Sequence, residues 1–343
     1  MRAELSARGI WAELEPAVGH MPRLVISGAD VLHAAPWRDA PQVQADRTIS
    51  PVDRRLGGSF LSAPFGMDDV TGGPPHGAPA NTRWIIKRHT AEALHWRLSQ
   101  AISGARIDGY IWVRDDEPAI YQRHVIFGGT GALTLAHHPM IAMAEGGFIR
   151  CAPKREILTE PAPLEPGANY WAPGQRVTGW SLDGPGRVVD LRAYPHDVPC
   201  EDFLTMVEAQ SHGIGWTAIH RDAEDDTILC LKRCEELPVT MLWVSNGGRR
   251  HAPWDGRHRG VLGVEDGCTA GGAGFATALG PNRVAAEGVR SAIPLGGVRV
   301  IRHAIVRLKG ARAIAQVTLA RGLCITYEDG GTRDVPFDVE AFA

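Results

Sequence analysis

The sequence predicts an all-β protein, a large two-sheet β-sandwich that spans residues 1–343 as a single domain. Most periodic segments are short and alternate apolar and polar residues with a period of two, as half-buried strands do. The 40 Gly and 24 Pro are scattered along the chain, which indicates many turns. Helical periodicity is rare and no fixed repeat is present. Two packed sheets are the simplest way to bury the apolar faces of so many strands.

The elements can be placed in order along the chain. Strands are expected at 83–87, 93–98, 110–114, 119–127, 132–137, 188–191, 227–232, 239–245, 260–264, 298–308 and 322–327. Gly-rich turns are expected at 128–131, 182–186, 246–248 and 328–331. Two stretches, 200–211 and 284–292, have enough 3.6-residue character to predict short helices. Pro-rich segments at 34–56, 67–80 and 153–174 are expected to be long loops, which in compact domains are often functional.

Composition and charge exclude several classes of protein. The formal net charge is −3 and there is no long Lys/Arg-rich run, so no nucleic-acid partner is expected. No apolar run approaches the ~18 residues of a membrane span, and the N-terminal segment lacks the apolar core of a signal peptide. A cytoplasmic protein with no membrane partner is therefore expected. The six Cys form no CxxC pair, and no phosphate-binding or metal motif is complete, so no metal or cofactor is expected.

Polar residues gather beside turns at three places, and the first is the segment 75–84. His76 and Gly77 lie in its Gly/Pro-rich part, and Asn81 follows shortly before the strand at 83–87. A histidine on such a loop can be held firmly and still reach a ligand. A solvated surface histidine is the alternative.

The second place is the strand end at His137 and His138. Neighbouring residues of a strand point to opposite faces, so His137 is expected to share a face with Leu133 and Leu135. If the leucines face the core, His138 faces the open side. The same geometry argues against a metal ion shared by the two histidines. One packed and one solvated histidine is the alternative.

The third place is the segment 245–254 followed by the strand at 260–264, which ends at the carboxylate pair Glu265 and Asp266. A short apolar strand that ends in a carboxylate is one way to position a general base. A strand that simply ends at charged residues is equally consistent with this pattern.

Taken in order, these places resemble the galactose mutarotase / aldose 1-epimerase superfamily. The resemblance runs from about Pro16 to Leu308, and each of its motifs is short, so their order and spacing carry it. The matching elements are 16–20 with 24–26, 62–66, His76-Gly77 with Trp84, His138-Pro139, and 243–248 with 263–265.

The resemblance implies a galactose mutarotase-like supersandwich that binds a monosaccharide in an open cleft and interconverts its anomers by acid/base ring opening. It also implies the roles of individual residues. Glu265 would be the base and His138 the acid, while His76 and the nearby Asn81 would bind the sugar. A binding carboxylate is expected in mid-chain, and Glu201 or Asp202 is the nearest match.

Two other functions remain open at this point. The family often has an Arg before the His-Gly element, whereas here the nearest is Arg55, and Met140-Ile141 replaces the usual aromatic residues. These departures favour a non-catalytic carbohydrate-binding or sensing module on the same fold. The 14 His are also consistent with a metal-dependent enzyme of cupin type.

A cluster at Arg249, Arg250, Arg257 and Arg259 is either a solvated loop or a contact for an acidic sugar. A monomer or a homodimer is expected.

Overall fold

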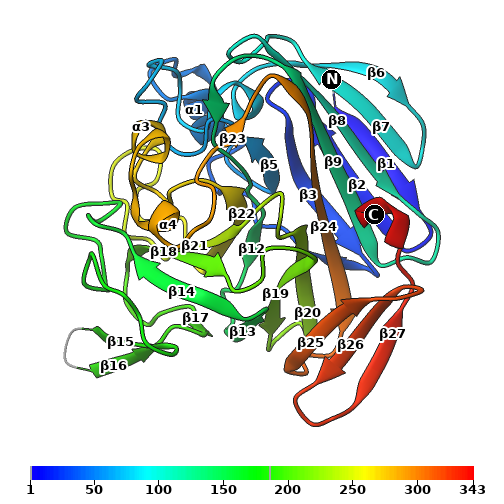
Figure 1. Ribbon diagram of the computed structural model, residues 1–343, viewed down its shortest axis with the longest axis vertical. Helices are drawn as coiled ribbons and strands as arrows, with labels where there is room; N and C mark the ends of the chain where they lie inside the picture. Colours follow the sequence, from blue (N-terminus) through cyan, green and yellow to red (C-terminus); the bar gives the residue numbers. More distant parts are fainter. Residues whose placement is uncertain (1, 185–186) are drawn as a thin grey trace.

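Two large sheets with antiparallel strand pairing make up most of this computed structural model, which describes residues 2–184 and 187–343 (Figure 1). The first sheet has eleven strands, of which nine form a continuous path. Their order is β1 (Ala3–Ala7), β2 (Ile10–Glu15), β3 (His20–Ile26), β5 (Ser59–Ser62), β11 (Leu135–His137), β22 (Val261–Cys268), β21 (Val239–Ser245), β18 (Glu201–Glu208) and β14 (Lys154–Thr159). Two short strands join the sheet outside that path: β4 (Ala29–Asp30) pairs with β3, and β12 (Met140–Ala142) pairs with β22.

The second sheet has nine strands. Their order is β17 (Ala193–Tyr194), β13 (Gly147–Cys151), β19 (Ile214–Arg221), β20 (Asp226–Arg233), β24 (Gly297–Lys309), β9 (Ala119–Gly128), β8 (Ala105–Val113), β7 (Ala93–Leu98) and β6 (Trp84–His89). Three smaller sheets pair β10 (Ala132–Leu133) with β23 (Ile293–Pro294), β15 (Ser181–Gly184) with β16 (Arg187–Asp190), and β25 (Ile314–Leu319) with β26 (Leu323–Tyr327) and β27 (Thr332–Val335).

Helices are few and short. They are α1 (Pro41–Ala45), α2 (Pro51–Arg54), α3 (Phe275–Leu279) and α4 (Arg283–Ala286), with 3-10 turns η1 (Ala78–Ala80) and η2 (Val339–Phe342). In Figure 1, α1, α3 and α4 gather on the side of the molecule away from the C-terminal sheet β25–β27. None of the helices in the described residues has the length and apolar character needed to cross a membrane.

Apolar side chains pack in three layers. The largest cluster lies between the two sheets and includes Leu135, Leu204 and Val264 from the first sheet with Ile228 and Ile305 from the second. Another joins the outer face of the second sheet to β25–β27. The third cluster lies on the outer face of the first sheet, where loops cover strands β11, β18, β21 and β22. The outer face of this sheet is therefore a second core surface, and it carries the candidate site described below.

The predicted all-β two-sheet sandwich is confirmed, and every predicted strand overlaps an observed one. The helix predicted at 200–211 is wrong, because this segment forms β18. All eight residues of β18 are buried, and both faces mix polar and apolar side chains, so the period of two is lost. The predicted loop at 153–174 begins with the strand β14, and the helix predicted at 284–292 is the single turn α4. Pro185 and Gly186 of the predicted turn at 182–186 lie outside the described residues.

A buried network of charges links the two sheets. Lys232 of β20 donates to the Thr240 hydroxyl at 2.6 Å, and its ammonium lies 2.9 Å from Glu208 and 3.1 Å from Asp266 of the first sheet. Burial raises the pKa of Asp266, but Lys232 and a hydrogen bond from His303 outweigh it and hold this pKa below its usual range. Because these groups are shielded from water, each depends on its partners to compensate its charge.

Replacing Lys232 with Met is expected to lower the free energy of unfolding by about 3–5 kcal/mol, because Asp266 would lose its buried ammonium partner. Lys87→Met removes the same charge from an exposed position of the edge strand β6 and should change stability by less than about 0.5 kcal/mol. Denaturant unfolding followed by tryptophan fluorescence measures both values. Equal losses for the two variants would contradict a structural role for the network.

Candidate active site

A cleft of about 260 Å³ opens on the outer face of the first sheet. Strands β11, β18, β21 and β22 form its floor, and the loops that cover the third apolar cluster form its walls. The side chains that line it include Phe65, His76, His138, Leu164, Phe203, Trp243, Arg249, Trp254 and Glu265. Three residues from widely separated parts of the sequence, His76, His138 and Glu265, thus meet in one cavity.

A histidine and a carboxylate are in direct contact at the floor of the cleft. His138 directly follows β11, and its Nε2 lies 2.9 Å from Oε1 of Glu265 on β22. Both side chains are almost fully buried, and the His138 ring stacks on Phe60 with centroids 4.6 Å apart. Within the described residues, Nδ1 of His138 and Oε2 of Glu265 have no hydrogen-bond partner. Each member of the pair therefore keeps one polar atom available for a ligand or a water molecule.

His76 reaches the same cleft from a tight loop. Its Nδ1 lies 3.0 Å from the Ser62 hydroxyl, and its ring packs edge-on against His138 with centroids 5.1 Å apart. Gly77 is required beside it, because the backbone has a φ of +65° and a Cβ would overlap the carbonyl of Ala63. Burial lowers the pKa of His76 well below its usual range, and the neighbouring His138 adds to this effect. The ring is therefore neutral at pH 7.

Asn81 lies behind the His76 loop rather than in the lining of the cleft. Its Oδ1 accepts a hydrogen bond from the Val52 amide at 2.9 Å, and its Nδ2 donates to the carbonyls of Pro75 and Gly77, each at 2.7 Å. These bonds tie the loop on both sides of His76 to the start of α2. The side chain thus positions the loop through backbone contacts.

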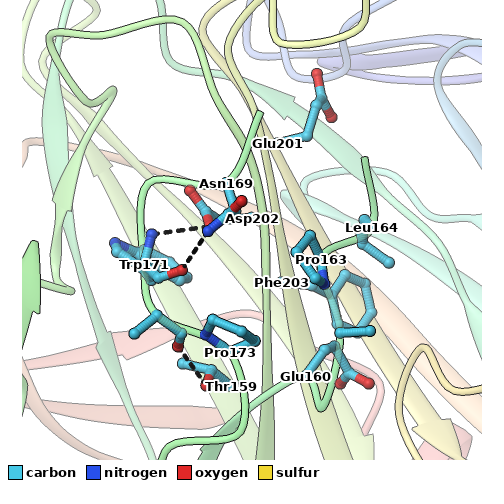
Figure 2. A pocket seen from close by; sticks show the side chains of 12 residues that line it. Thr159, Glu160, Pro163, Leu164, Asn169, Trp171, Pro173, Glu201, Asp202 and Phe203 are labelled. Atoms are coloured by element: carbon cyan, nitrogen blue, oxygen red, sulfur yellow. Dashed lines mark hydrogen bonds between the residues drawn. The ribbon is translucent and has the colours of Figure 1, made fainter. Parts of the chain in front are cut away.

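Glu201 and Asp202 point to opposite sides of β18, as Figure 2 shows. Asp202 accepts hydrogen bonds from the Tyr170 amide at 2.9 Å and the Trp171 amide at 3.1 Å, and burial raises its pKa to about 6. The cavity of Figure 2, between this strand and the 160–173 loop, measures only about 20 Å³, close to the space of one water molecule. Asp202 therefore anchors the loop from the side of the strand that faces away from the cleft.

Glu201 is on the cleft side of the strand but beneath the surface. It accepts hydrogen bonds from Trp243 Nε1 at 2.9 Å and from the Ser245 hydroxyl at 2.8 Å. Burial raises its pKa to about 7, although Arg249 and these hydrogen bonds act in the opposite direction. The carboxyl therefore fixes the indole of Trp243, which forms part of the cleft wall.

Several residues of the site carried no signal in the sequence. His258 is fully buried, stacks on Trp243 with centroids 5.3 Å apart, and places its Nδ1 2.8 Å from the Ser245 hydroxyl. Phe60 and Trp254 complete the aromatic surroundings. These side chains lie on loops or on strands without a recognisable motif, and only the three-dimensional packing brings them together.

The chemistry available in the cleft is proton transfer. A carboxylate and an imidazole lie 2.9 Å apart in a site largely shielded from water, and general acid/base catalysis uses such a pair of groups. Across residues 2–184 and 187–343, no group of three or more His, Cys, Asp or Glu is arranged to hold a metal ion. The two-sheet architecture also differs from the cupin fold, the alternative that the histidine content suggests.

Comparison with known proteins identifies the fold. No family model and no curated protein matches the sequence. Among solved structures, a protein of Escherichia coli K12 provisionally described as an aldose 1-epimerase superposes with a TM-score of 0.61 at 12% identity, covering 90% of this chain and 99% of that one. A galactose mutarotase related enzyme of Lactobacillus acidophilus gives 0.58 at 9% identity, with coverage of 91% and 98%. A galactose mutarotase-like protein of Lactobacillus casei gives 0.57 at 10%, with coverage of 90% and 100%. The chain therefore has the galactose mutarotase-like fold.

Proposed function

We propose that this protein binds a monosaccharide or a sugar derivative in the cleft and interconverts its anomers. The observation that carries the proposal is the contact between His138 and Glu265 on the floor of the cleft. The descriptions of the structural neighbours as mutarotase-related proteins support the same substrate class. The volume of about 260 Å³ lies just below the range of roughly 300–1,000 Å³ that is usual for drug-sized ligands, so it favours a small one.

Anomer interconversion needs one base and one acid around the same carbon. Glu265 takes the proton of the anomeric hydroxyl while His138 gives a proton to the ring oxygen, and the bond between C1 and the ring oxygen breaks. The aldehyde then rotates about the bond to C2. On closure, His138 takes back the proton of the chain hydroxyl and Glu265 returns its proton to the new anomeric oxygen. Both groups end in their starting protonation states, so no further proton source is required.

The remaining predicted site residues act around this pair in the proposal. The neutral His76 hydrogen-bonds a sugar hydroxyl from the loop that Asn81 holds in place. Glu201 fixes the indole of Trp243, which supplies apolar surface to the wall of the cleft where the sugar binds. Asp202 contributes from the opposite side of β18 by holding the amides at 170–171.

A non-catalytic sugar-binding module is the second candidate, and one observation favours it. His138 Nε2 and Glu265 Oε1 are already in contact at 2.9 Å, so a sugar must separate or bridge them before proton transfer begins. A binding module would leave this contact intact and use only the outer atoms of the pair. Tight sugar binding by calorimetry without faster mutarotation is the result that distinguishes this function.

Glu265→Gln is expected to slow mutarotation by about 10²–10⁴-fold, because the amide keeps the shape of the side chain but cannot accept the anomeric proton. Polarimetry and NMR exchange with a panel of aldoses measure the rate. Glu145→Gln, an exposed position in a turn, is the matched control and should keep the rate of the unmodified protein. If no aldose mutarotates faster with the protein than in buffer, the catalytic proposal is wrong.

The variants His138→Asn and Glu265→Gln should not have additive effects. Both residues act in the same proton-transfer step, so the double variant is expected to be within about tenfold of the slower single variant. Single-turnover NMR exchange at fixed sugar concentration gives the three rates. Fully multiplicative losses would indicate that the two residues work independently.

The stability of the protein should depend on the protonation of Glu201. Its pKa of about 7 in the folded protein exceeds the ordinary value of 4.5, so the folded state holds this proton more tightly than the unfolded chain. The stability from this group is fully present below about pH 4.5 and is lost as the pH rises to about 7. Between pH 5 and pH 8, the unfolding free energy of the unmodified protein should fall by up to about 3 kcal/mol relative to Glu201→Gln. Parallel pH profiles from denaturant unfolding would contradict the raised pKa.

A further inference from the structure

Arg249 lies in the wall of the cleft, where its guanidinium is close to two indole rings. Its Cζ is 4.3 Å from the Trp254 ring centroid and 5.4 Å from that of Trp243. The preceding Gly248 allows this position, because a Cβ there would lie only 2.7 Å from the backbone of Cys200. The contact with the indole rings is a cation–π interaction, which stabilises the guanidinium without using its N–H groups as hydrogen-bond donors.

The charge of Arg249 is only loosely compensated. Its Nε is buried, and none of the described residues accepts a hydrogen bond from its side chain. The carboxylates of Glu165 and Glu201 lie 3.8 Å and 3.9 Å from Nε, too far for a hydrogen bond. Glu201 already accepts bonds from Trp243 and Ser245, and its pKa of about 7 leaves it only partly ionised at neutral pH. A guanidinium with five N–H donors therefore faces the cleft without a close acceptor.

The neighbouring arginines do not share this arrangement. Arg250 is exposed and does not line the cleft, Arg257 donates to the carbonyl of Pro253, and Arg259 donates to the carbonyl of Gly256. From the sequence, the four arginines are either part of a solvated loop or a contact for an acidic sugar. In the structure they do not share one environment. Three of its members belong to the loop, and Arg249 alone of the four lines the cleft.

We propose that the cleft takes a monosaccharide bearing a carboxylate or a phosphate, and that Arg249 binds this anionic group through its free N–H groups. The inference rests on the proposed function, since it names the class of sugar for the same site. Arg249 and His138 both lie near the indole of Trp243, whose ring centroid is 5.4 Å from Arg249 Cζ and 5.8 Å from the His138 ring centroid. The proposed anion site and the His138–Glu265 pair therefore line the same cleft.

Isothermal titration calorimetry with matched sugars tests the proposal. Galacturonate and glucuronate supply a carboxylate, glucose 6-phosphate supplies a phosphate, and galactose and glucose are the neutral references. The unmodified protein is expected to bind one anionic class at least about tenfold tighter than its neutral reference, as charge-assisted bidentate bonds to Arg allow. This preference should weaken as salt is raised. The two anionic arms show which group is recognised.

Two variants of the cleft should shift the preference in opposite directions. Arg249→Met keeps an apolar chain over Trp254 and should abolish the preference for the anion. Glu165→Gln removes the nearest competing carboxylate and should strengthen binding of the anion. Arg250→Met loses the same charge outside the cleft and should leave both affinities unchanged. Thermal unfolding of each variant checks that the fold is kept.

The outcomes separate this inference from the function on which it rests. Equal binding of neutral and anionic sugars, or a preference that persists in Arg249→Met, would overturn the assignment of Arg249 while leaving anomer interconversion of neutral sugars in place. Absence of binding by every sugar of both classes would overturn the proposed function and the inference together.

Discussion

The alternation of side chains along two neighbouring strands is the constraint on which the candidate site depends. At the end of β11, His137 points between the sheets and stacks on His303 with centroids 4.5 Å apart, while the next residue, His138, enters the cleft. On the paired strand β22, Asp266 faces inward to Lys232 and Glu265 faces the cleft. Each cleft residue is thus fixed by the inward-facing residue next to it. A register slip of one residue in either strand would exchange the two sets.

This arrangement explains how a site on the outer face of a sheet can be rigid. The inward side of β22 is held by a buried ion pair to the second sheet, and the outward side is covered by aromatic residues of the third apolar cluster. His138 and Glu265 are therefore held by packing on both faces of the sheet, with the His76 loop adding an edge-on ring contact to His138. The loops contribute the groups expected to vary with the ligand, His76 and Arg249 among them. In the proposed function, the acid/base pair is held in place in this way and the side chains of the surrounding loops select the ligand.

Most of the fold could be predicted from the sequence, and the main exception, β18, has a physical cause. Half-buried strands such as β7 retain the period of two, since one face meets the core and the other is more open to solvent. In β18, covered on both faces, this contrast disappears, and the sequence wrongly predicts a helix for a run that includes Glu201, Asp202 and Glu208. The same two-sided burial keeps the carboxylates of Glu201 and Asp202 away from solvent, with pKa values raised to about 7 and 6.

The sequence by itself determined the all-β class, most strand positions, the opposite directions of His137 and His138, and the three segments that meet in the cleft. These depend on local periodicity and on the order of short motifs, which are properties of the chain alone. Only the tertiary structure decided that Glu201 supports Trp243, that Asn81 holds the backbone of the His76 loop, and that Arg249 separates from its neighbours to line the cleft. Glu201 and Trp243 are tens of positions apart, as are Asn81 and Val52, and the role of Arg249 depends on which side of a loop faces the cavity. Local sequence patterns carry no information about such contacts.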